Sequence, residues 1–65
     1  MMSNTVEQLQ TQYDDFLVEN AKFSSGNSAA GTRARKALAE MSKLIKQRRL
    51  EITEEKNSRK AAKAA

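Results

Sequence analysis

The sequence GNSAAGTRARK at residues 26–36 indicates a chain reversal followed at once by the start of a helix. Gly26 and Asn27 are among the residue types that most readily adopt a positive φ, so the chain can turn here. Ser25, Asn27 or Ser28 can then cap the next helix with a side-chain oxygen. We therefore expect two helices joined by this short connection.

The same stretch combines several features of an anion-binding site. The first turn of a helix presents unpaired backbone N–H groups and a partial positive charge. Thr32, Arg33, Arg35 and Lys36 add a hydroxyl and three cations to that turn. This arrangement would suit a phosphate, and the alternative is a plain connection between helices whose cations face water.

Before the turn, apolar residues recur at alternating spacings of three and four, which is a heptad pattern on one helix face. The spacing predicts a helix over Thr5–Phe23, with Leu17 beside the seam and the carboxylates mainly off it. The seam consists of Val6, Leu9, Tyr13, Phe16, Asn20 and Phe23.

A longer helix is predicted after the turn, over Ser28–Asn57, because no proline interrupts the sequence. Gly31 falls in its first turn, where glycine costs less than in mid-helix and permits close backbone approach. At about 100° per residue the apolar residues gather on one face, namely Ala34, Ala37, Leu38, Met41, Leu44, Ile45 and Ile52. The opposite face holds Arg35, Lys36, Lys43 and Lys46, with Arg33 and Arg49 near its borders. Side-chain pairs that join Glu51 and Glu55 to Gln47, Arg48 and Arg59 would support the helix beyond Ile52.

The size of the chain predicts association. A chain of 65 residues without cysteine or histidine has no disulfide and no Cys/His metal site to stabilise a small core. We therefore expect an all-α fold in which a helical hairpin over residues 1–57 assembles into a homodimeric bundle, or a tetramer. A short basic tail over residues 58–65 follows, which either extends the second helix or hangs free of it. The interface is predicted at Val6, Leu9, Tyr13, Phe16, Leu38, Met41, Ile45 and Ile52.

The charge is divided unevenly along the chain. The net charge of +4 combines one cation against four carboxylates through Phe23 with eleven cations against four carboxylates from Ser24 onward. A basic half joined to an acidic assembly half favours a polyanion partner. Because only 5% of the residues are aromatic, phosphate contact is favoured over base stacking. Nucleic acid is therefore the favoured polyanion, and the residues predicted to contact it are Asn27, Gly31, Thr32, Arg33, Arg35, Lys36, Lys43, Lys46 and Arg49.

Catalysis is not expected. General acid–base chemistry needs a tuned group in a cleft, and here histidine is absent and the carboxylates lie on exposed helix faces. The glycines at Gly26 and Gly31 lack the GKS or GKT ending of a nucleotide loop. We expect no enzyme activity, cofactor, metal or small-molecule substrate, and no apolar run approaches the length of a membrane span.

Residues 26–38, GNSAAGTRARKAL, resemble the signature of the small bacterial histone-like nucleoid proteins of the linker-histone-like type, in which GNKAAGTRxRK follows an acidic amphipathic helix. The segments Leu44–Ile52 and Lys56–Ser58 are also similar, so the resemblance covers nearly the whole chain after Asn4. It implies binding of double-stranded DNA with little sequence preference, compaction of a bacterial or viral genome, and a cytoplasmic nucleoid or virion location.

The resemblance also implies roles for individual residues. Arg33, Arg35 and Lys36 would contact DNA, with Thr32 and Gly31 beside them. The chain departs from the pattern at Ser28, where a lysine is usual. It also departs at the tail, because the long lysine- and alanine-rich extension of some members is reduced here to residues 58–65. Both departures weaken the expectation of strong compaction.

Two other functions fit the same pattern. The chain can be a small helical scaffold protein whose cations bind acidic protein partners, and a basic amphipathic helix can also lie on an anionic membrane. A DNA-binding protein differs from both because its affinity for duplexes of any sequence falls steeply with salt. Among the cations, the turn group of Arg33, Arg35 and Lys36 is expected to bind phosphate more strongly than Lys43 and Lys46, because the helix dipole adds to its charge.

Overall fold

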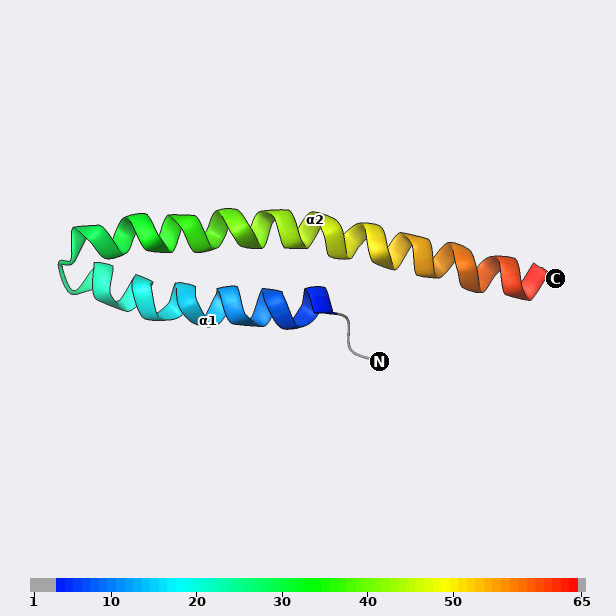
Figure 1. The fold of residues 1–65 in the computed structure, drawn as a ribbon, viewed down its shortest axis with the longest axis horizontal. Coiled ribbons are helices and arrows are strands. Elements are labelled where there is room, and N and C mark those ends of the chain that lie inside the picture. The colour runs from blue at the N-terminus through cyan, green and yellow to red at the C-terminus, as the bar shows by residue number, and fades with distance from the viewer. Residues whose placement is uncertain (1–3, 65) are drawn as a thin grey trace.

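The computed structural model describes residues 4–64 of the chain, with side chains described through Ala62. Two helices, α1 (Asn4–Ser24) and α2 (Ser28–Ala64), run antiparallel as a hairpin that measures 59 × 18 × 13 Å (Figure 1). The predicted all-α hairpin is therefore confirmed, and α1 is one residue longer at each end than expected. A bundle of more than one hairpin stays a prediction.

The predicted end of the second helix at Asn57 is wrong, because α2 continues through Ala64. No proline or glycine follows Gly31, and the last residues are mainly alanine and lysine, which favour helix. The Nη2 atom of Arg59 lies 2.7 Å from Oε1 of Glu55, a pair one helical turn apart that supports this segment. Residues 58–64 thus extend the helix as a rod past the start of α1 (Figure 1).

The connection between the helices is closed by backbone hydrogen bonds. Gly26 has φ +107°, a value that a side chain would disfavour. The Gly26 N–H donates to the Phe23 carbonyl at 3.0 Å and the Asn27 N–H donates to the Lys22 carbonyl at 3.0 Å, which is a Schellman ending. The Asn27 side-chain Oδ1 then accepts from the Ala30 N–H at 3.2 Å. The expected turn and cap are confirmed, with Asn27 as the capping residue.

The helices meet through small residues. The buried apolar side chains in the described part of the chain are Ala30, Ala34 and Ala37, and no large side chain there is fully buried. Beside them, a Cβ atom built on Gly31 would lie only 2.7 Å from Cδ1 of Phe23. Close approach of the two helices therefore depends on Gly31 and the alanines, and the core of one hairpin is thin.

The face of α1 that contacts α2 is rotated from the predicted seam. Thr5 is buried and Gln12 and Glu19 are half-buried, whereas Val6 and Tyr13 are 39% and 45% exposed. Thr5 and Glu19 bond across to α2, so these polar ties, and not the widest apolar stripe, set the rotation of the helix. Val6 and Tyr13 therefore lie on one side of the hairpin and not between its two helices, and their place in an interface between hairpins stays a prediction.

A polar cluster closes the open end of the hairpin. Thr5 Oγ1 donates to Glu51 Oε2 at 2.6 Å, and Gln47 Nε2 donates to Thr5 Oγ1 at 3.1 Å. Glu51 also accepts from Gln47 Nε2 at 3.2 Å and from Arg48 Nη1 at 3.1 Å, which confirms the predicted pairing of Glu51 with both residues. Beyond this cluster α2 has no other described helix beside it, and its side chains from residue 52 to 62 are all exposed. Neither described helix is both long enough and apolar enough to span a membrane.

Candidate nucleic-acid interface

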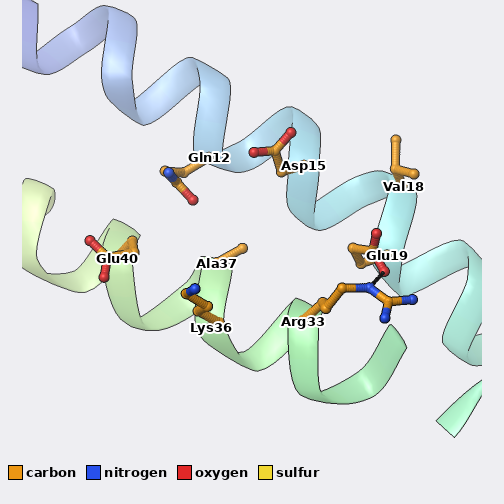
Figure 2. Close-up of a pocket in the computed structure, with 8 residues that line it drawn as sticks. All are labelled: Gln12, Asp15, Val18, Glu19, Arg33, Lys36, Ala37 and Glu40. Atoms are coloured by element: carbon orange, nitrogen blue, oxygen red, sulfur yellow. Dashed lines mark hydrogen bonds and ion pairs between the residues drawn. The ribbon is translucent and has the colours of Figure 1, made fainter. Parts of the chain in front are cut away.

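The hairpin has two broad sides of different chemistry. On the polar side, a hollow of about 420 Å³ is lined by Gln12, Asp15, Val18 and Glu19 from α1 and by Arg33, Lys36, Ala37 and Glu40 from α2 (Figure 2). On the apolar side, an open groove of about 520 Å³ is lined mainly by Phe16, Asn20, Phe23, Gly31, Ala34, Arg35 and Leu38. Arg35 and Lys36 are neighbours in sequence but border opposite sides.

On the polar side, cations of the chain are paired with its own carboxylates. Arg33 Nε lies 2.7 Å from Glu19 Oε2, and the dashed line in Figure 2 marks this bond between the two helices. Lys22 Nζ lies 3.8 Å from the other oxygen of Glu19. The carboxylates of Asp15 and Glu40 line the same hollow. Three carboxylates are balanced by three cations on this side, Lys22, Arg33 and Lys36, and two of these cations are paired with Glu19. The polar side therefore has no net positive charge to attract a polyanion.

The edge of α2 that points away from α1 is different. At about 100° per residue, Lys43 and Lys46 fall on this edge and Lys36 lies where it borders the polar hollow; we call these three the lysine ridge. All three are exposed, and Lys36 and Lys46 have no ion pair among the described residues. Lys43 lies 3.6 Å from Glu40, but its side chain is 76% exposed, so solvent screens that pair.

The remaining predicted site residues divide into two groups. Thr32 and Arg35 border the apolar groove, and Arg49 lies toward the same side of α2; all three are exposed. Asn27 and Gly31, in contrast, have structural roles, because one caps α2 and the other admits the Phe23 ring. The sequence pattern did not separate these roles, since a turn, a cap and a phosphate site all use small polar residues.

Two further cations continue along α2 beyond the hairpin. Lys56 and Lys60 are exposed and, among the described residues, have no ion pair, whereas Arg59 is paired with Glu55. Neither was among the predicted site residues: Lys60 was placed in the basic tail after Asn57, and Lys56 lay in the predicted helix without a role. The continuous run of helix-forming residues after Ile52 was the available signal.

Among the described residues, no group of three or more His, Cys, Asp or Glu side chains could hold a metal ion.

Comparison with known proteins supplies the remaining evidence. No curated protein and no solved structure matches the chain. A family model described as Histone H1-like protein Hc1 matches residues 3–58, which is well over half of the 65 residues. The chain therefore belongs to the histone H1-like Hc1 family, as the resemblance of its turn signature indicated.

Proposed function

We propose that this protein binds double-stranded DNA through phosphate contacts of the lysine ridge and organises the chromosome at the nucleoid. The observation that carries this proposal is the separation of charge around α2. Between Thr32 and Thr53 the two carboxylates, Glu40 and Glu51, both lie toward α1, where Glu51 is bonded to Thr5. The outer edge over the same length carries only cations among its ionisable groups.

The shape of the ridge favours little sequence preference. Lys36 and Lys46 are separated by ten residues, or roughly 15 Å along the helix, and duplex DNA carries one charge per roughly 1.7 Å of its axis. Flexible lysines on such an edge can follow the phosphates without reading base edges. The aromatic residues, Tyr13, Phe16 and Phe23, all belong to α1, so none is available on the ridge for base stacking.

The helix beyond the hairpin extends this surface. Lys56 and Lys60 add charge on a segment whose described side chains are all exposed, so a duplex can approach it from several directions. We infer that residues 58–65 act as a basic extension of the binding surface, which increases range and association rate more than specificity. A protein that acts through such contacts needs no catalytic group, in keeping with its family.

The proposal is tested by removing equal charge from two places. Lys43→Ala with Lys46→Ala shortens the ridge, whereas Lys22→Ala with Arg33→Ala removes two cations that bind Glu19. We expect the ridge pair to reduce the slope of log affinity against log salt by about two, because each lost phosphate contact contributes about 0.9. The Glu19 pair should change the slope by less than about one. Fluorescence anisotropy with a random duplex at several salt concentrations measures both, with circular dichroism to confirm folding.

Two outcomes contradict the proposal. If the Glu19 pair costs as much affinity as the ridge pair, the turn and the polar side form the binding surface, as the sequence pattern alone suggested. If the unaltered protein binds no duplex even at low salt, DNA is not its partner. A scaffold role with acidic protein partners would then be the better interpretation.

A further inference from the structure

The proposed function leaves the apolar side of the hairpin unused. Leu38, Ile45 and Ile52 on α2 are each a little under half exposed, and Tyr13 and Phe23 on α1 are exposed to a similar degree. Among the residues with described side chains, the buried ones are three alanines and Thr5. Such a core buries too little apolar surface to offset the conformational entropy of about sixty ordered residues. A stable fold therefore requires that the apolar side be buried against a partner.

The exposed area matches a dimer interface. With Val6 and Leu17, seven large apolar side chains lie about half exposed on this side, at roughly 80 Å² each, or roughly 550 Å² together. A standard interface buries roughly 800 Å² per partner, of which somewhat more than half is apolar. Leu38, Ile45 and Ile52 are also spaced seven residues apart, the repeat by which helices pack side by side in bundles.

Charge selects a second copy of the chain as the occupant and selects its orientation. α1 carries four carboxylates against one cation, and α2 carries eleven cations against four carboxylates. Two hairpins that meet on their apolar sides can be related by a two-fold axis along the helices, which places each α1 across the α2 of the second copy. An axis across the helices instead places α1 on α1 and α2 on α2, with like charges opposed.

One pair of residues makes the choice specific. The bonds Glu19–Arg33 and Thr5–Gln47 fix the heights of the two helices, so that Asp14 lies within about one helical turn of the height of Arg35. Asp14 is on the outer edge of α1 and Arg35 borders the apolar groove. With the axis along the helices, each Asp14 meets Arg35 of the second copy.

This orientation has a consequence for DNA. We propose that two hairpins pair with α1 across α2, so that their lysine ridges point in opposite directions and one dimer bridges two duplexes. The other orientation would bring both ridges to the same edge and bind a single duplex. The inference rests on the proposed DNA binding for its partner, but the pairing itself does not require DNA.

The pairing is tested by charge reversal in sedimentation without DNA. Arg35→Glu and Asp14→Lys each oppose like charges at two symmetric contacts, so each should weaken dimerisation roughly tenfold. The double variant restores both contacts and should recover most of that loss. If it does not, or if the unaltered protein sediments as a folded monomer at micromolar concentration, the proposed pairing is wrong.

Bridging is tested separately from binding. A biotinylated duplex on beads should retain a second, fluorescent duplex when the full protein is present, and the retention should fall with Arg35→Glu and return in the double variant. Anisotropy on one duplex is measured beside it. Binding of one duplex without retention of the second overturns bridging and leaves the proposed function standing. Absence of binding in both assays overturns the proposed function, while sedimentation still decides the pairing.

Discussion

The polar side of this hairpin completes its hydrogen bonds within the chain, whereas the apolar side leaves its large side chains partly exposed. On the polar side, Glu19, Arg33 and the cluster around Glu51 find partners within the chain, and no buried side-chain nitrogen or oxygen of the described residues lacks a hydrogen bond. On the apolar side, the large side chains remain about half exposed. The comparison teaches that one hairpin can complete its polar bonding alone but not its hydrophobic core.

The strongest test of this comparison introduces aspartate on the apolar side in one variant and on the polar side in another. Leu38→Asp with Ile45→Asp should abolish the dimer and most of the helical signal at micromolar concentration, because each buried Leu or Ile contributes about 1.5–3 kcal/mol and a dimer loses four of them. Val18→Asp is the matched control, since Val18 is 55% exposed and lines the polar hollow. It should change stability by less than about 0.5 kcal/mol. Sedimentation and circular dichroism measure both, and a double variant that stays dimeric would show that the apolar side is not the interface.

A smaller effect is expected where the two helices approach most closely. Gly31→Ala places a Cβ against the Phe23 ring, at 2.7 Å if nothing moves, so the expected cost is about 1–3 kcal/mol. In a Phe23→Ala background the same substitution should stabilise the protein by up to about 1 kcal/mol, because alanine favours helix over glycine. Thermal unfolding of the four proteins gives the coupling. If Gly31→Ala instead lowers DNA affinity equally in both backgrounds, Gly31 serves DNA approach and not helix packing.

Interactions between residues close in the sequence could be predicted from it. The turn at Gly26 and the cap at Asn27 depend on residues within five positions of each other, and both were predicted correctly. The pairing of Glu51 with Gln47 and Arg48 was predicted for the same reason. Interactions within one helix follow directly from its spacing.

Contacts between the two helices could not be predicted from the sequence. Thr5 is buried and bonded to Glu51, 46 residues away, although threonine in a polar segment gives no sign of burial. The partner of Arg33 is Glu19, and sequence spacing alone did not relate them across the turn. Because these bonds set the rotation of α1, part of its apolar stripe, including Val6 and Tyr13, lies outside the contact between the two helices. The site prediction did not relate Arg33 to Glu19, so it treated Arg33 as a cation without a protein partner.

The smallest expected effect concerns the bond that joins the helices on the polar side. Arg33→Ala removes the 2.7 Å contact to Glu19, whose side chain is 17% exposed, whereas that of Arg33 is 50% exposed. Solvent screening at the arginine limits the loss of stability to about 0.2–1 kcal/mol. The loss should shrink as salt rises toward about 1 M, because the Debye length falls to about 3 Å. Urea unfolding at low and high salt measures it.

The matched substitution Glu19→Gln separates the two roles of Arg33. If Arg33 mainly ties the helices, Glu19→Gln should lower stability about as much as Arg33→Ala, and the two changes together should cost little more than either alone, because they remove the same bond. Freed from Glu19, however, Arg33 becomes available to phosphate, so Glu19→Gln should raise duplex affinity at low salt while Arg33→Ala leaves it nearly unchanged. An opposite result, with Arg33→Ala costing DNA affinity and no stability, would assign Arg33 to the DNA surface and make the polar side part of it.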